Sequence, residues 1–422
     1  MNVLNQQPAS EPQQTRPRVL RTAFPTKGWL FATFLLCLGA GLGRFIGYRL
    51  DRNPAAQPAA ATQNQLAAGP WGTLQVTKIA IERPDEFISV GRFRASTNRW
   101  FFEKFTPDQL RDLFNQNSLS AEQQNSLSDT NSWQISSNGI YVTPGDDIIL
   151  GLSPIVRENI YRVLSSSPAN YYQRYPFIIR ADQADEWFDK NGLAPATDQL
   201  IRGLLYRRGD ALCFADMMEA LSRIPSLEEK RLVAKMFSRE TTLLVKLRVE
   251  EEEDVEPLVK YWGKLGQAKD IRPLLESLAR TPGGATLDIV HLLTPFARNR
   301  LYTYPFPSEN AIENGHDCFW SSMNFFNTEP DDRFTRFDEV KRTLQTDYYP
   351  VPGDPTFGDI IWFVDSNGTA IHSAVYIAQD FLFTKNGANS NEPWILMDLD
   401  DLLTVYAIHA PLRTVAYRLK RE

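Results

Sequence analysis

The sequence contains few cysteines and histidines, and this scarcity excludes several kinds of site. Its 422 residues include three cysteines, too few for a disulfide framework, and four histidines. These residues do not show the spacing of a metal site. Residues 71–300 also contain no phosphate-binding glycine loop. We therefore expect neither a bound metal nor a cofactor.

The chain also lacks a strong excess of either charge. Its 45 basic and 51 acidic residues give a net charge of −6. Recognition of nucleic acid needs a concentrated basic face, so we expect no nucleic-acid partner. Hydrophobic residues make up 43% of the chain and charged residues 23%, which is typical of a folded protein. This composition excludes a disordered or multi-pass chain.

One long hydrophobic segment, residues 29–50, lies near the N-terminus. Its first part is uncharged, and its last part contains two arginines able to snorkel to lipid headgroups. A signal peptide cleaved near Ala61 is the alternative, but three arginines would then separate the apolar run from the cut. We predict a transmembrane anchor at residues 29–50, between a disordered tail (residues 1–28) and a flexible linker (residues 51–70).

The basic residues around this segment predict its orientation. Four precede its uncharged part, and three (Arg44, Arg49 and Arg52), offset by Asp51, follow that part, so the positive-inside rule slightly favours an N-terminus inside the cell. The expected protein is a single-pass membrane protein, in contact with lipid through residues 29–50, whose soluble body is extracytoplasmic. Nothing in the sequence indicates its oligomeric state.

The chain is too long for one hydrophobic core, and its patterns change along its length. We predict a mixed α/β domain at residues 71–195, with a strand at 73–82 and helices at about 108–114 and 154–164. A mainly helical domain is predicted at residues 196–300. Its expected elements are helices at about 196–207, 210–223, 226–238, 254–262 and 271–280, and a strand at 242–249.

The last part, residues 301–422, carries residues suited to chemistry. Cys318 follows a histidine and an aspartate and begins a segment of helical spacing. The positive end of a helix favours thiolate over thiol, and thiolate is the nucleophile. A helix at about 337–344 and strands at 358–364, 371–378 and 380–387 follow, with His372 near the start of the second strand. The pattern predicts a cysteine-bearing helix followed by a small antiparallel meander.

The order of these motifs resembles the NlpC family of papain-like cysteine hydrolases. The motifs are Asp317-Cys318, Gly358-Asp359 and His372-Ser-Ala-Val-Tyr376. The resemblance covers about residues 301–422 and implies a papain-like helix packed on an antiparallel sheet. The expected fold class is therefore α+β: an N-terminal transmembrane helix, a mixed α/β middle region rich in helices, and a C-terminal papain-like domain.

A hydrolase of this type divides its chemistry among three side chains. His372 takes the thiol proton from Cys318 and returns a proton to the leaving amine. A third polar group orients the imidazole. The family usually has a histidine there, whereas this chain offers Thr384, Lys385 and Asn386. We choose Asn386, because an amide oxygen can accept the ring N–H.

His316, two residues before Cys318, is a further candidate for a part in the site, and both Cys318 and His372 could instead be packed core residues. The predicted function is a membrane-anchored cysteine hydrolase that cleaves an amide bond of a peptide or protein through a thioester. The family resemblance implies cell-wall peptide as the substrate. The alternatives are an acyltransferase or transglutaminase on the same dyad, and a non-catalytic membrane-anchored binding or scaffold protein.

Overall fold

The computed structural model describes residues 64–65, 68–88, 98–189, 192–209, 211–307, 315–388, 390–407 and 411–420. Helices and strands are mixed along these residues, which confirms the α+β class. No helix in the described ranges is long and apolar enough to cross a membrane. The predicted tail and anchor, residues 1–50, lie outside them.

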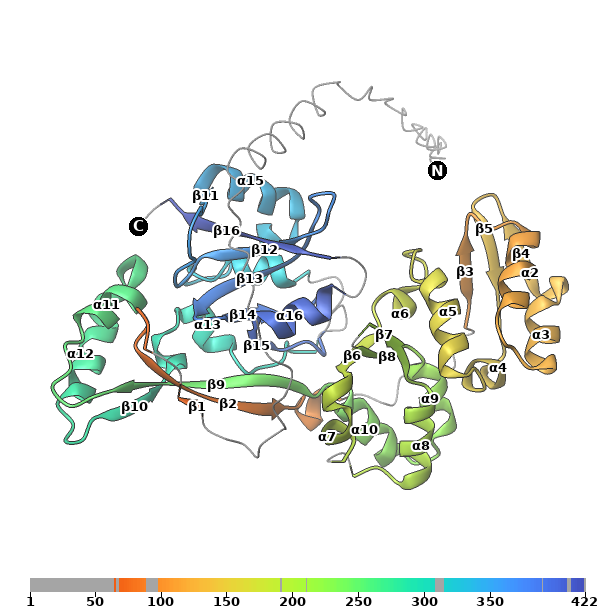
Figure 1. The fold of residues 1–422 in the computed structure, drawn as a ribbon, viewed down its shortest axis with the longest axis horizontal. Helices are drawn as coiled ribbons and strands as arrows, with labels where there is room; N and C mark the ends of the chain where they lie inside the picture. Colours follow the sequence, from red (N-terminus) through yellow and green to blue (C-terminus); the bar gives the residue numbers. More distant parts are fainter. Residues whose placement is uncertain are drawn as a thin grey trace, which may run out of the picture. The chain divides into compact units, whose positions relative to one another are not determined.

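Two long strands join distant parts of the chain. β2 (Thr73–Ile81) and β9 (Glu240–Val249) pair antiparallel along their whole length. Short strands β1 (Asn64–Gln65) and β10 (Ala285–Asp288) extend the sheet in the order β1-β2-β9-β10 (Figure 1). Alternate residues of β9 are buried, as the sequence pattern predicts.

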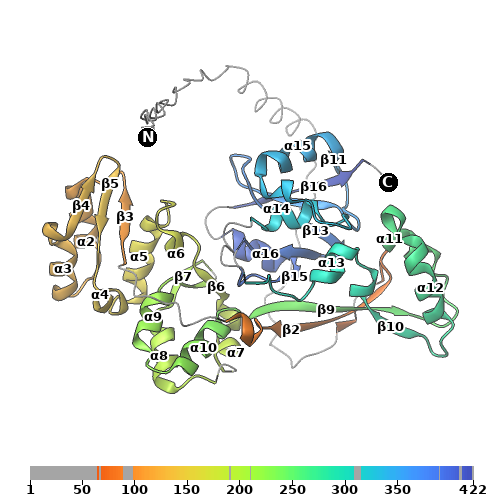
Figure 2. The ribbon, with the colours of Figure 1, turned by 180° about the vertical axis from the view of Figure 1, so that it is seen from behind.

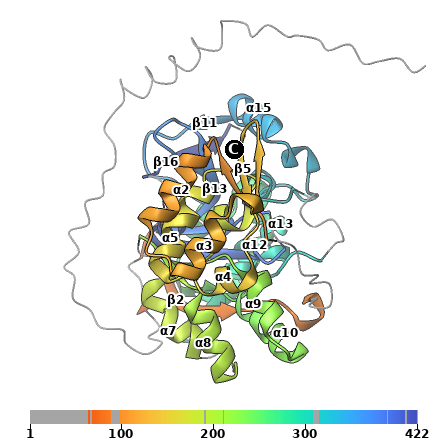
Figure 3. The ribbon, with the colours of Figure 1, turned by 90° about the vertical axis from the view of Figure 1, so that its right-hand side faces the viewer.

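The segment between these strands begins with a sheet in the order β3-β5-β4. Helix α2 starts after Thr106, whose side chain accepts from the Gln109 N–H in a capping box. Helices α2, α3 and α5 pack on this sheet around a common hydrophobic cluster (Figures 1 and 3). The elements are β3 (Trp100–Glu103), α2 (Pro107–Gln116), α3 (Ala121–Ser128), β4 (Trp133–Ser136), β5 (Gly139–Val142), α4 (Asp146–Leu150) and α5 (Pro154–Leu164).

A second small sheet follows, in the order β6-β8-β7. The helix predicted at residues 210–223 is wrong in its first half, because β8 (Ala211–Phe214) is a strand paired on both sides. A short, fully apolar run suits a buried strand as well as a buried helix. Cys213 therefore lies in β8. The other elements are α6 (Tyr171–Arg174), β6 (Phe177–Arg180), α7 (Ala184–Asp189), α8 (Pro195–Gly203), β7 (Tyr206–Arg208), α9 (Met217–Arg223) and α10 (Leu227–Met236).

The C-terminal sheet is antiparallel, in the order β11-β16-β12-β13-β14-β15. The predicted meander is confirmed as β12, β13 and β14. The strands are β11 (Tyr348–Pro350), β12 (Ile360–Val364), β13 (Ala370–Ala378), β14 (Phe381–Lys385), β15 (Trp394–Asp398) and β16 (Arg413–Leu419). The accompanying helices are α11 (Glu256–Trp262), α12 (Ala268–Ala279), α13 (Pro295–Arg300), α14 (Cys318–Met323), α15 (Phe337–Asp347) and α16 (Leu399–Tyr406).

Helices cover both faces of this sheet. Side chains of α14 and α15 share a hydrophobic cluster with Trp362, Val375 and Phe383. Leu402 of α16 belongs to a separate cluster with alternate residues of the same strands, such as Phe363. Because neighbouring residues of a strand point to opposite faces, α14 and α16 lie on opposite faces (Figures 1 and 2).

The predicted domain boundaries fall inside shared cores. The cluster under α14 also contains residues of β9, α11 and α12, on the other side of residue 300. Tyr261 donates a hydrogen bond to the Ile377 carbonyl at 2.8 Å, and Thr242 Oγ1 donates to the Leu396 carbonyl at 2.9 Å. A second cluster likewise joins residues on either side of 195, from Ile179 to Phe237. Local sequence pattern does not reveal which sheets share a core.

Candidate active site

Cys318 is the first residue of α14, as predicted. Asp317 caps the helix, because its Oδ1 accepts from the Trp320 N–H at 2.9 Å. Cys318 is 6% exposed. Burial, and then the Asp317 carboxylate, raise the pKa of the Cys318 thiol, whereas the backbone N–H of Ser373 and the side chain of Lys385 act to lower it. The helix start alone therefore does not produce a thiolate.

His372 is wholly buried in β13. Burial lowers the pKa of its imidazole to about 3, so the ring is neutral near pH 7. Its Nε2 lies 2.8 Å from Thr384 Oγ1, and its ring stacks on Tyr406 with the centroids 4.0 Å apart. Among the residues that the structure describes, the other ring nitrogen, Nδ1, is buried without a hydrogen-bond partner. His372 thus has one ring nitrogen held by a partner and the other uncommitted.

The group that holds the imidazole is Thr384 rather than Asn386. Thr384 Oγ1 also lies 3.4 Å from Asn386 Oδ1, so Asn386 acts on the ring only through Thr384. The Asn386 amide approaches Met397 Sδ at 3.5 Å. The sequence analysis considered both residues. Of the two, Thr384 is the one whose side chain reaches the imidazole on the neighbouring strand β13.

Among the described residues, no hydrogen bond joins Cys318 to His372, and their side chains belong to opposite faces of the sheet. The Cys318 thiol is next to the N–H of Ser373, the residue that follows His372 in β13. Tyr406 stacks on His372, and the pKa of its phenol is raised first by burial and then by Cys318. The two predicted residues are therefore linked through Ser373 and Tyr406, and His372 Nδ1 does not accept a proton from the thiol.

Strand alternation divides the polar side chains between the two faces of the sheet. His372 packs against Phe363 and bonds to Thr384, on the face covered by α16. Lys385 pairs across strands with Trp394, whose Nε1 donates to Ser321 Oγ of α14 at 2.9 Å. Lys385 therefore points to the α14 face, toward Cys318.

Lys385, which the sequence analysis considered only as a group to orient the imidazole, points instead to the α14 face. It is wholly buried, and its Nζ donates to the Gly387 carbonyl. Burial lowers the pKa of Lys385 to about 8, against the raising effects of Glu392, Cys318 and Asp317. Glu392 is half-exposed, yet desolvation raises its pKa to about 7, opposed by Lys385. The period-two pattern of β14 was the available signal, because it separates Lys385 from Thr384 and Asn386.

The remaining motif residues have structural contacts. His316 stacks on Trp320 with the centroids 3.9 Å apart, and its Nε2 lies 3.1 Å from Asp332 Oδ1. It therefore braces α14 against the 3₁₀ turn Asp332–Thr335. Asp359 of the Gly-Asp motif forms a two-point ion pair with Arg418, at 2.8 and 2.7 Å. These hydrogen bonds and ion pairs of His316 and Asp359 do not involve the Cys318 thiol.

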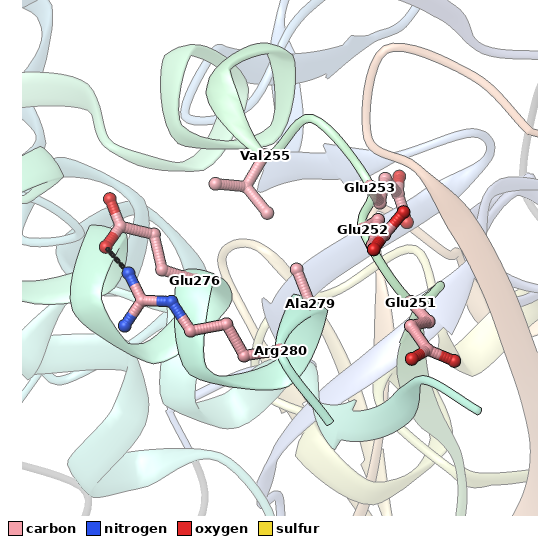
Figure 4. Close-up of a pocket in the computed structure, with 7 residues that line it drawn as sticks. All are labelled: Glu251, Glu252, Glu253, Val255, Glu276, Ala279 and Arg280. Atoms are coloured by element: carbon pink, nitrogen blue, oxygen red, sulfur yellow. Dashed lines mark hydrogen bonds and ion pairs between the residues drawn. The ribbon is translucent and has the colours of Figure 1, made fainter. Parts of the chain in front are cut away.

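A surface concavity of about 440 Å³ lies away from these residues, around the loop after β9 and helix α12 (Figure 4). Its only cation, Arg280, pairs with Glu276 at 3.1 Å. The lining residues are Glu251, Glu252, Glu253, Val255, Glu276, Ala279 and Arg280. Within the described part of the chain, no group of three or more His, Cys, Asp or Glu side chains is placed to hold a metal ion.

Comparisons of this chain with protein-family models, with curated proteins and with solved structures give no match. The resemblance to the NlpC family therefore rests on the sequence motifs alone.

Proposed function

We propose that the C-terminal region is a thiol hydrolase that cleaves amide bonds, with Cys318 as nucleophile and His372 as the proton carrier. The observation that supports this most directly is the state of His372. Its Nε2 is anchored to Thr384 Oγ1 at 2.8 Å while Nδ1 is uncommitted, and the next residue, Ser373, directs its N–H at the Cys318 thiol. An anchored neutral imidazole with one free nitrogen is able to accept a proton.

The reaction follows from these roles. Because the imidazole lies on the α16 face and the thiol at the start of α14, the site first has to open and bring the two groups together. The thiol proton then moves to His372 Nδ1 as the Cys318 sulfur attacks the amide carbon. When the tetrahedral intermediate collapses, the carbon–nitrogen bond breaks and the imidazolium proton goes to the leaving amine. Water then attacks the thioester, His372 takes one of its protons, and the acid product leaves as that proton returns to sulfur. Each turnover consumes one water and restores the neutral pair.

The resting pair is neutral because both groups are desolvated. Burial raises the pKa of the thiol and lowers that of the imidazole to about 3, so an ion pair of thiolate and imidazolium is disfavoured. Proton transfer is then coupled to bond formation, and the site has to open to admit a substrate. With the predicted anchor at residues 29–50, the hydrolase would act on peptide or protein near a membrane surface.

The test is hydrolysis by the full chain in detergent. Peptide amides, including cell-wall peptides, are incubated with the protein. Intact-mass spectrometry is then used to detect an acyl group on Cys318. We expect Cys318→Ala to abolish hydrolysis and the acyl adduct, while Cys213→Ala, a buried cysteine of another core, leaves both. Hydrolysis that persists in Cys318→Ala contradicts the proposal. Transfer of the acyl group to a labelled amine would identify the acyltransferase alternative.

The second candidate function is a non-catalytic binding or scaffold protein. The observation in its favour is burial, because Cys318 is 6% exposed and His372 0% exposed. A packed, neutral cysteine is an ordinary core residue. Alkylation of Cys318 by iodoacetamide no faster than that of a free thiol, from pH 5 to pH 9, together with the absence of an acyl adduct, would favour this function.

A further inference from the structure

Lys385 is a buried cation beside the start of α14. Its side chain is wholly buried, and its Nζ lies 5.7 Å from the centre of the Trp394 ring. Trp394 Nε1 in turn donates a hydrogen bond to Ser321 Oγ, in the same short helix as Cys318. The lysine head group therefore lies against the helix that carries the nucleophile.

Burial and Asp317 oppose a negative charge on Cys318, and the groups that favour it besides Lys385 are the uncharged backbone N–H groups of Ser373 and Phe319. The thiol is desolvated and follows Asp317, whose carboxyl adds to the unfavourable potential. His372 does not supply the compensating charge, because its own burial keeps the imidazole neutral. The cation that acts on the thiol is Lys385, and the interaction is mutual, because Cys318 and Asp317 both favour the charged form of Lys385.

A wholly buried lysine is costly, and the structure shows what retains it. Glu392, between β14 and β15, is the acidic partner with the largest effect on Lys385. The Gly387 carbonyl accepts a hydrogen bond from Nζ. If only the aliphatic part of the lysine side chain were needed in the core, the ammonium group could remain at the surface, as it does in most lysines. Here the charge itself is enclosed next to a thiol.

We propose that Lys385 is a positioning residue of this site, whose enclosed positive charge stabilises the Cys318 thiolate while His372 carries the proton. This inference rests on the proposed function for its purpose but concerns a property of the thiol that can be measured without substrate.

The experiment measures the thiolate directly in the full chain. Thiolate absorbance in the ultraviolet is recorded against pH, with Cys318→Ala subtracted, and iodoacetamide labelling of the Cys318 peptide is followed by mass spectrometry. We expect Lys385→Met to move the Cys318 titration to higher pH by about one unit and to lower the labelling rate at pH 7, where Lys385 is mostly charged, by about tenfold. The control is Lys341→Met, an exposed lysine of α15, which should leave both unchanged.

The outcomes separate this inference from the hydrolase. A folded Lys385→Met protein whose Cys318 titration coincides with that of the wild type overturns the role of Lys385, even if Cys318→Ala abolishes hydrolysis. A shifted titration supports it, even if no amide is hydrolysed. Lys385→Gln, which retains a polar head group, provides the same comparison if the methionine variant does not fold.

Discussion

His372 Nε2 and Thr384 Oγ1 lie 2.8 Å apart, and the two side chains are 0% and 1% exposed. The pair links neighbouring strands β13 and β14 from within the core. Because water does not reach either atom, the hydrogen bond has no substitute when one partner is removed. The same contact that orients the imidazole therefore also contributes to stability.

Thr384→Val keeps the shape of the side chain but leaves His372 Nε2 unsatisfied. We expect a loss of about 1–3 kcal/mol in the free energy of unfolding, measured by urea denaturation, because a buried polar group loses its partner. Thr384→Ser restores the hydroxyl and should recover most of this loss. If Asn386→Ala lowers both stability and hydrolysis more than Thr384→Val does, the assignment of Thr384 as the orienting group is wrong.

The burial of His372 also predicts a pH dependence. The pKa of His372 is about 3 in the folded protein and about 6.5 in the unfolded chain, so the unfolded chain binds more protons between these values. The stability contributed by the neutral imidazole is therefore present above pH 6.5 and is lost as pH falls toward 3.

His372→Phe removes this titration while keeping a ring against Tyr406. Between pH 7 and pH 5 the wild type should lose about 2 kcal/mol more stability than the variant. Glu392 and Glu219, whose pKa values burial raises to about 7, titrate with the opposite sign, but they occur in both proteins and cancel in the comparison. Parallel stability curves for the two proteins would show that His372 is not neutral and buried in solution.

The Gly-Asp motif makes a separate prediction. Asp359 is 1% exposed and binds Arg418 of β16 through both carboxylate oxygens. Asp359→Asn should cost about 2–3 kcal/mol in urea denaturation, because it leaves the partly buried guanidinium without its charged partner. Glu276→Gln breaks an exposed ion pair with Arg280 and should change stability by less than about 0.5 kcal/mol. Equal effects of the two substitutions would contradict this role for Asp359.

In the middle of the chain, Arg157 and Asp216 form a buried ion pair, with Arg157 Nε 2.8 Å from Asp216 Oδ2. Arg157→Met should destabilise the protein by about 3–5 kcal/mol, because Asp216 loses its charged partner and keeps only the Tyr161 hydroxyl, and three carbonyls that accept hydrogen bonds from Arg157 lose their donor. The double variant Arg157→Met/Asp216→Asn should lose less than the sum of the two single changes. Additive losses, measured by denaturation, would indicate that the two charges do not depend on each other.

Local sequence pattern predicted the framework of the site well. Period-two alternation indicated β13, and helical spacing after Asp317 indicated the start of α14 at Cys318. Each of these patterns lies within a single strand or helix, so it can be read from a few neighbouring residues. The run Ala211–Phe214 failed because every residue in it is apolar and no period can be read.

The contacts that decide chemistry were harder to predict, because they join distant residues. Arg418 as the partner of Asp359, and Tyr406 as the stacking partner of His372, depend on how strands and helices meet. The division between Thr384 and Lys385 was accessible in principle, since neighbours in a strand face opposite ways. The burial of Cys318 could not be predicted in this way, and it raises the pKa of the thiol where the helix start alone was expected to lower it.

Tyr406 provides the last prediction, on access to the site. Its ring stacks on His372 at 4.0 Å, and it ends α16, which covers that face of the sheet. A stacked aromatic pair contributes about 0.5–1.5 kcal/mol, so its removal should raise the population of open conformations about two- to thirteenfold. Cys318 labels with iodoacetamide only when the site opens. Tyr406→Ala should therefore increase the labelling rate by that factor at pH 7, while Tyr406→Phe, which keeps the ring, should not. Unchanged labelling in a folded Tyr406→Ala protein would mean that reagents reach Cys318 from the α14 face.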